Sequence, residues 1–204
     1  MGWNPLKRKT DRNLEQDRKD IEHLLLEAIE SFENHDHPEA IKRFQLIIKL
    51  YPEHPIAHLM LGRGYIEIKD FSGAIGALHD HLQIIPHSEE AMIYLGIAYF
   101  ECKELALARA RFEEAITLKG NSMLARENLV ITKVMAGRLE EALVDLLRLR
   151  KERPGDKDII ELIVLTLGKM GKWEIAKRYL HQNEGTAMLD TVLALLVLEP
   201  HLSG

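Results

Sequence analysis

Apolar residues recur at steps of three and four along nearly the whole chain, and short polar or proline-containing breaks interrupt them. One such run extends from Leu24 to Phe32 and is followed by the polar turn Asn34–His37. Another extends from Ala40 to Ile48 and stops before Pro52. Because this spacing places apolar side chains on one face of a helix, the pattern predicts a series of short amphipathic helices. No segment alternates with a period of two over the length of a strand, so we expect no sheet.

A fixed period underlies these runs, because a small residue returns every 34 positions and a large apolar residue follows four positions later. The small residues are Ala40, Ala74, Ala108, Ala142 and Ala176. The large residues are Phe44, Leu78, Phe112, Leu146 and Leu180. The helix breaks keep the same period and are Pro52, Pro86, Gly120 and Pro154. Such a repeat predicts five stacked helix pairs, in which the alanine lets two helices approach closely and the large residue fills the space beside it.

The period also divides the chain into three parts. In the second repeat it predicts one helix over Leu59–Ile68 and a partner over Ala74–Ile85. Extending this register predicts a repeat array over residues 14–184, preceded by a tail over 1–13 and followed by a terminal helix over 185–204.

The tail is locally basic in a chain of net charge −5, with its cationic residues gathered between Lys7 and Arg12. We expect a flexible, solvated terminus, and the alternative is a docking arm anchored by Trp3. No apolar run follows the basic residues, so the tail is not expected to be a secretory signal.

The composition narrows the classes of function. With 46% hydrophobic residues the chain is expected to fold, and its net charge of −5 argues against a nucleic-acid binder that works by bulk electrostatics. The single cysteine, Cys102, cannot form an intrachain disulfide and fits a reducing compartment. The longest apolar run, Val192–Leu198, is too short for a membrane span. We therefore expect a cytoplasmic protein that binds no nucleic acid and spans no membrane.

Two first-helix segments, Leu61-Gly62-Arg63-Gly64-Tyr65 and Leu95-Gly96-Ile97-Ala98-Tyr99, carry a family resemblance. Together with the alanine ladder and the proline breaks they resemble the tetratricopeptide repeat, and the resemblance covers about residues 21–184. Three repeats depart from the glycine and tyrosine of the pattern. The residues at those two positions are Ala28 and Ser31, Val130 and Lys133, and Val164 and Leu167.

The resemblance implies an all-α fold, a right-handed solenoid of five antiparallel helix pairs, here with an apolar C-terminal helix. It also implies that the first helices line a concave groove, in which members of the family mostly bind peptides without catalysis of their own. The family's groove positions, carried over by register, fall mainly on apolar residues. They are Leu25, Ile29, Phe32, Leu59, Arg63, Ile66, Ile93, Ile97, Phe100, Ile131, Val134 and Leu165, with Glu67, Glu101, Glu127 and Glu161 beside them.

An apolar groove of this size is a surface that soluble monomers rarely leave uncovered. It is filled by an apolar or amphipathic segment of a partner, by the chain's own terminal helix, or in part by ordinary packing between repeats. Family members that hold a peptide's terminal carboxylate use several cationic and amide side chains, whereas only Arg63 is cationic here. We therefore do not expect capture of a terminal carboxylate.

The terminal helix is apolar on nearly all sides between Met188 and Leu198. A helix of this kind is buried, either against the last repeat or against a second copy or partner. The candidate association residues are Leu189, Val192, Leu193 and Leu196.

The search for chemistry finds no catalytic or metal site. The histidines of His79-Asp80-His81 diverge on a helix, and those of His35-Asp36-His37 would need further ligands from elsewhere. Cys102 has no base fixed next to it in the pattern. We predict a non-catalytic, cofactor-free interaction module, an adaptor, scaffold or chaperone-like protein that binds a protein or peptide segment. The alternative is a self-assembling structural protein whose groove or terminal helix forms a homo-oligomer.

Overall fold

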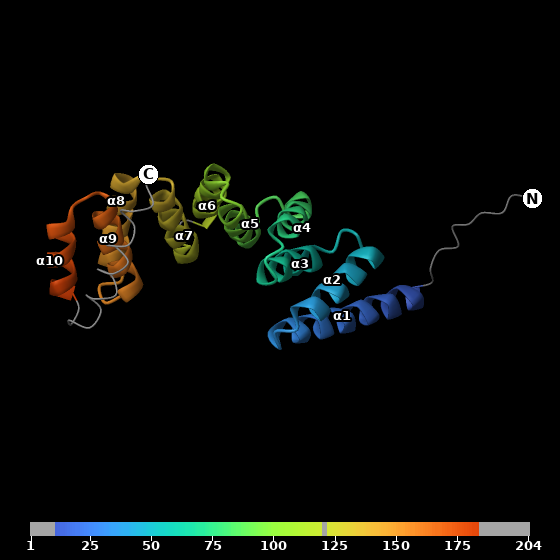
Figure 1. The fold of residues 1–204 in the computed structure, drawn as a ribbon. Helices are drawn as coiled ribbons and strands as arrows, with labels where there is room; N and C mark the ends of the chain where they lie inside the picture. The colour runs from blue at the N-terminus through green and yellow to red at the C-terminus, as the bar shows by residue number, and fades with distance from the viewer. Residues whose placement is uncertain (1–10, 120–121, 184–204) are drawn as a thin grey trace, which may run out of the picture.

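The computed structural model describes residues 11–119 and 122–183, and within these ranges the chain forms ten α-helices and no strand (Figure 1). The helices are α1 (Asp11–Glu33), α2 (His37–Leu50), α3 (Pro55–Glu67), α4 (Phe71–Ile84), α5 (Glu89–Glu101), α6 (Leu105–Lys119), α7 (Met123–Met135), α8 (Leu139–Glu152), α9 (Lys157–Lys169) and α10 (Trp173–Asn183). Each helix packs against the next, so the pairs follow one another in an elongated array. The prediction of an all-α repeat fold is therefore confirmed.

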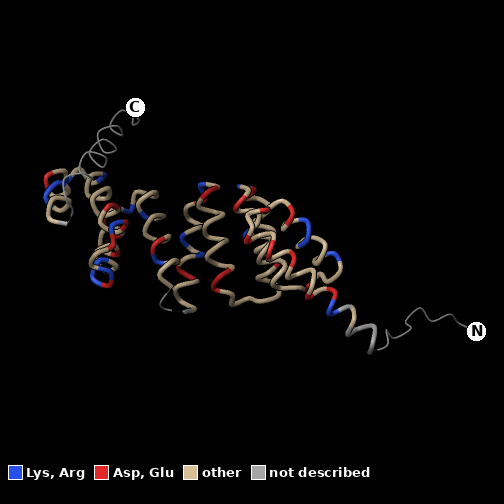
Figure 2. The backbone as a smooth tube through the Cα atoms, turned by 90° about the horizontal axis from the view of Figure 1, so that it is seen from below, with Lys and Arg blue, Asp and Glu red and all other residues tan. Residues whose placement is uncertain are grey.

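The predicted C-terminal helix, with Leu189, Val192, Leu193 and Leu196, lies outside the described residues. None of the helices within the described ranges is both long and apolar enough to cross a membrane. Acidic and basic residues are spread along the array and are not separated at its two ends (Figure 2).

Every helix pair contains the same tight turn between its two helices. The turn has one residue with a left-handed backbone, and these residues are His35, Lys69, Lys103, Gly137 and Gly171, spaced by the repeat period. The backbone N–H of the following residue bonds back to the last turn of the first helix, as from Asp70 to the Tyr65 carbonyl at 2.8 Å. This bond satisfies a carbonyl that the helix end would leave open. The side chain of Asp70 then caps the second helix by accepting from the Gly73 N–H.

The alanine ladder lies where the two helices of each pair meet. The five alanines are between 0% and 1% exposed, and the five large residues that follow them are between 0% and 2% exposed. Both sets belong to the core that runs along the array. The prediction that these residues pack the paired helices is therefore confirmed.

In the second and third pairs, a glycine on the first helix lets the two helices of the pair approach closely. A Cβ atom added to Gly96 would lie 2.6 Å from Phe112 Cε1, and one added to Gly62 would lie 2.6 Å from Leu78 Cγ. Contacts this short are not available to a real Cβ, so the large residue occupies the space that a side chain at the glycine would need. Absence of a side chain at this position thus sets the separation between the paired helices.

The fourth pair lacks this contact and is joined differently. Val130 stands where the second and third repeats have glycine, and α7 and α8 make the least extensive contact of the five described pairs. Lys133 Nζ instead reaches Asp145 Oδ2 of α8 at 2.6 Å, with the lysine side chain only 12% exposed. An ion pair therefore links these two helices over part of their length.

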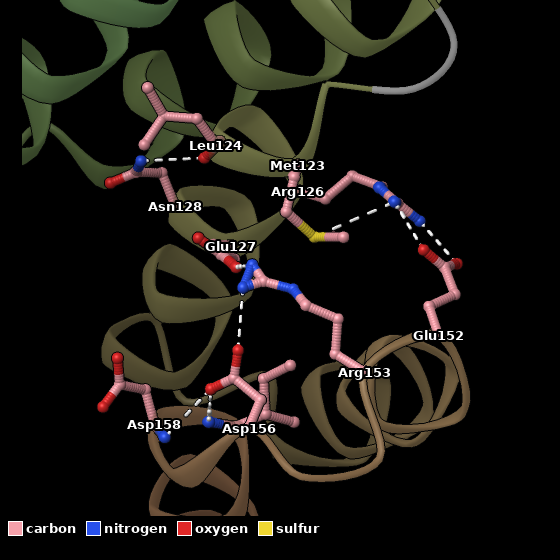
Figure 3. A network of polar contacts seen from close by, with 10 residues as sticks. Met123, Leu124, Arg126, Glu127, Asn128, Glu152, Arg153, Asp156 and Asp158 are labelled. Atoms are coloured by element: carbon pink, nitrogen blue, oxygen red, sulfur yellow. Dashed lines mark hydrogen bonds and ion pairs between the residues drawn. The ribbon is translucent and has the colours of Figure 1, made fainter.

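Two arginines add further polar contacts between α7 and α8 and extend them to the start of α9, as Figure 3 shows. Arg126 of α7 donates to both carboxylate oxygens of Glu152 at 2.7 Å each. These hydrogen bonds hold the pKa of Glu152 below its ordinary value. Arg153 contacts Glu127 of α7 and Asp156, the residue that caps α9. The network joins α7, α8 and the start of α9.

We predict that Gly96→Ala lowers the free energy of unfolding by about 2 kcal/mol, because the new Cβ must displace the Phe112 ring or separate α5 from α6. The matched control is Gly76→Ala in α4, where a Cβ would meet no atom within 4 Å. That substitution should stabilise the helix by about 0.5–1 kcal/mol. Urea denaturation followed by circular dichroism measures both. Equal effects of the two substitutions would contradict the packing role of Gly96.

The first turn of α3 is capped by a histidine. His54 Nδ1 accepts from the Ala57 N–H at 3.2 Å, which requires the neutral imidazole. Burial, followed by the charge of nearby His58, lowers the pKa of His54 below its ordinary value of 6.5, against the opposing effect of its own backbone. The unfolded chain therefore takes up this proton more readily than the folded one.

Stability from this cap should be complete above about pH 6.5 and should be lost as the pH falls towards the lower pKa of the folded state. His54→Asn supplies a cap that does not titrate. We expect the thermal midpoint of the variant to fall less than that of the native chain between about pH 8 and pH 5. Parallel pH profiles of the two midpoints would show that His54 does not cause this dependence.

Candidate functional site

An arginine sandwiched between two aromatic rings links the first three repeats. The Arg63 guanidinium carbon of α3 lies 5.0 Å from the Phe32 ring centroid of α1 and 5.2 Å from the Tyr94 ring centroid of α5. Cation–π attraction favours this arrangement on both faces of the guanidinium. The residues of α1, α3, α5, α7 and α9 at the predicted groove positions are called the inner face below, and Arg63 lies at the centre of its first three helices.

The polar contacts of Arg63 are incomplete. Its Nη1 atom lies 3.9 Å from Glu90 Oε1 and 3.5 Å from Met60 Sδ, while its Nε atom is buried without a hydrogen-bond partner among the described residues. A buried donor of this kind usually finds an acceptor in the protein, in water or in a ligand. The two aromatic rings therefore hold the guanidinium in place, and its hydrogen-bonding capacity is only partly used within the described residues.

Next to Arg63 the inner face is hollowed into a cavity of about 350 Å³ between the C-terminal parts of α1 and α3. Apolar side chains form one part of its wall and ionisable ones the other. Its lining residues are Ile29, Phe32, Glu33, His35, His37, Met60, Arg63 and Glu67. A cavity with this mixed lining suits an amphipathic side chain better than a purely apolar one.

The pKa of the Tyr94 hydroxyl reflects the charges of this region. Burial raises the pKa of Tyr94 above its ordinary value of 10, and the positive charge of Arg63 opposes that rise. The carboxylates of Glu90 and Glu67 add to the rise because they disfavour a nearby phenolate. Negative charge therefore surrounds Arg63 on this face.

Most of the predicted groove residues lie half-buried on their helices. These are Leu25, Ile29, Phe32, Leu59, Arg63, Ile66, Ile97, Phe100, Ile131 and Leu165. The structure brings three of them, Ile29, Phe32 and Arg63, to one cavity. Ile93 and Val134 differ, because each is only 5% exposed and belongs to a core cluster between repeats. These two have little surface to offer a partner, since neighbouring first helices pack against each other there.

The register carried over from the family did not include Tyr94 or Met60, although both contact Arg63. They occupy the same position of successive repeats, 34 residues apart, and that periodicity was the available signal. Two exposed apolar residues were missed as well: Leu26 of α1 is 66% exposed and Met135 of α7 is 51% exposed.

A second cavity, of about 380 Å³, lies between α6, α7 and α8 beside Val130. It is lined by equal numbers of basic and acidic residues, and each of them has an ion-pair partner, such as Arg126 with Glu152 and Lys133 with Asp145. Its charges are therefore satisfied within the protein, and the inner-face cavity is the better candidate for a binding site.

Comparison with known proteins places this architecture in a family. Residues 25–89 match the model of the tetratricopeptide repeat. No curated protein matches the chain significantly. Residues 25–89 therefore belong to the tetratricopeptide repeat family, and the remaining helix pairs share the period and the fold of this segment.

Solved structures share the arrangement of helix pairs. A crystal structure of MamA is 24% identical, with a TM-score of 0.69 over 74% of this chain and 89% of that one. A tetratricopeptide repeat protein from Parabacteroides merdae is 18% identical, with a TM-score of 0.72 over 89% of this chain and 72% of that one. The first repeat domain of Spaghetti (RPAP3), bound to an HSP90 peptide, is 18% identical, with a TM-score of 0.57 over 58% and 94% of the two chains. At these identities the similarity shows the shared fold alone.

We predict that Arg63→Met raises the pKa of Tyr94 further, because the substitution removes the cation that stabilises the phenolate. The absorbance of ionised tyrosine measured across a pH titration reports this change, and Tyr94→Phe identifies the contribution of this ring. The control is Arg43→Met, since Arg43 pairs with Glu39 and Glu27 and contacts no tyrosine ring that is described. An unchanged titration in Arg63→Met would refute the stacked arrangement.

Proposed function

We propose that the chain is a non-catalytic protein-interaction module, an adaptor or scaffold, that binds an apolar or amphipathic segment of a partner along its inner face. The observation that carries this proposal is the centre of that face. There the Arg63 guanidinium, held between two aromatic rings, lies among half-buried apolar side chains. A bound peptide would cover this apolar surface and place its polar groups next to the exposed part of the guanidinium.

The apolar part of the proposed site continues beyond Arg63. Ile66 of α3 and Ile97 and Phe100 of α5 are half-buried and pack at the edge of the core clusters. Side chains in this position can exchange water for a partner without leaving the core, which makes them suitable anchors. The solved repeat domain of Spaghetti (RPAP3) with an HSP90 peptide is a precedent for peptide binding on this fold.

The ionisable groups argue for binding and against catalysis. Each described group with a shifted pKa has a structural explanation: His54 caps a helix, Tyr94 stacks on Arg63, and Arg126 pairs with Glu152. Cys102 is free and exposed at the end of α5. These groups do not converge on one cavity, as a catalytic site would require.

Replacing Ile97 and Phe100 together by Glu should weaken binding of peptides selected from a random library by about a hundredfold, since two charges would enter the apolar contact. Fluorescence anisotropy with the selected peptides gives the dissociation constants. The control is Leu107→Glu on α6, which is 43% exposed on the second helix of the same repeat and should change nothing.

Circular dichroism establishes that each variant is folded, and the Ile97→Ser, Phe100→Ser pair replaces the double glutamate if that variant unfolds. Selected peptides that bind a folded variant as tightly as the native chain would overturn the proposal. Failure to select any peptide for the native chain would do so as well.

A further inference from the structure

Two carboxylates stand at the inner-face cavity, one from each of its two helices. Glu33 ends α1 and Glu67 ends α3, and they occupy the same position of consecutive repeats, 34 residues apart. Both are exposed, both line the cavity, and neither forms an ion pair or hydrogen bond among the described residues. Because both carboxylates line the same cavity, a single cation entering it is attracted by both.

The charge around the cavity remains negative when Arg63 is included. Its guanidinium faces Glu90 at 3.9 Å and is covered by an aromatic ring on each side. The carboxylates of Glu33 and Glu67 thus line the cavity with one fixed cation, and Glu90 adds a third carboxylate next to that cation. The only lysine in the turn that follows α3, Lys69, is exposed and lies two residues beyond Glu67. A second carboxylate brought by a partner would be repelled by this arrangement, whereas a cation would be attracted.

The wall of the cavity fits the rest of such a side chain. Ile29, Phe32 and Met60 provide apolar surface next to the carboxylates. Lysine and arginine carry a charged end on an apolar stem, and they bury the stem while the charge stays at a polar boundary. A volume of about 350 Å³ is ample for one such side chain.

We infer that this cavity receives a lysine or arginine side chain of the partner, so that the inner face selects apolar segments that are basic. The inference rests on the proposed function, because it assigns a charge preference to the same peptide-binding face. Glu101, at the equivalent position of α5, continues the acidic row along the face and favours a second basic residue in the same segment. Lys103 beside it lies over the Phe100 ring, at 5.8 Å from the centroid.

The test uses three fluorescent peptides that share leucines at helical spacing and carry lysine, glutamine or glutamate at the remaining positions. The native chain should bind the lysine peptide about tenfold more tightly than the glutamine peptide and the glutamate peptide most weakly. The preference should decline with added salt, because the carboxylates are exposed.

The Glu33→Gln, Glu67→Gln pair should reduce affinity for the lysine peptide about tenfold and leave affinity for the glutamine peptide unchanged. The control pair, Glu53→Gln and Glu140→Gln, makes the same change in net charge at exposed positions away from the cavity and should have no effect.

Equal binding of all three peptides would overturn this inference and leave the proposed function standing, whereas binding of none would overturn both. A lysine preference that survives in Glu33→Gln, Glu67→Gln would place the charge selection elsewhere and overturn the assignment of this cavity. Analytical ultracentrifugation of the same variants tests whether a second copy of the chain occupies the cavity instead of a partner. If they change the oligomeric state and not the peptide affinity, a second copy fills the cavity and the inference fails.

Discussion

The fold depends on how closely the two helices of each pair can approach. In the second and third repeats a glycine on the first helix faces a leucine or phenylalanine on the second, and no side chain fits between them. All five pairs share the same tight turn, and the close packing of the second and third pairs keeps their first helices side by side. The inner face results from this packing, because the opposite side of each first helix is buried against the second helix of its pair.

The departure of the fourth repeat shows what the constraint does. In this repeat, which has Val130 in place of glycine, α7 and α8 make the least extensive contact of the five described pairs, and ion pairs such as Lys133 with Asp145 link the two helices. The cavity beside these helices is lined by charged residues that already have ion-pair partners in the protein. At α1 and α3, by contrast, Glu33 and Glu67 have no ion-pair partner among the described residues and lie beside an apolar wall. Binding is therefore proposed at the cavity between α1 and α3, where the carboxylates have no partner among the described residues. It is not proposed at the cavity between α6, α7 and α8, where the charges are paired.

Periodicity was sufficient to predict the fold and most of the helix bounds. The helix predicted over Ala74–Ile85 is observed as Phe71–Ile84, with a start three residues earlier because Asp70 caps it. The site was only partly predictable. Register alone placed Ile93 among the groove residues, yet contacts between α5 and its neighbours bury it. The stacking of Arg63 on Tyr94 depends on the distance between repeats, which a single sequence does not contain.

The central claim is that partners bind on the inner face of α1, α3 and α5. Amide chemical shifts of the isotope-labelled chain, recorded by NMR while a tight-binding peptide is added, test it most directly. The account predicts shift changes concentrated on these three helices, with the largest changes around Phe32, Arg63 and Glu67. Changes confined to α2, α4 and α6 would contradict it, because those helices form the opposite side of the array.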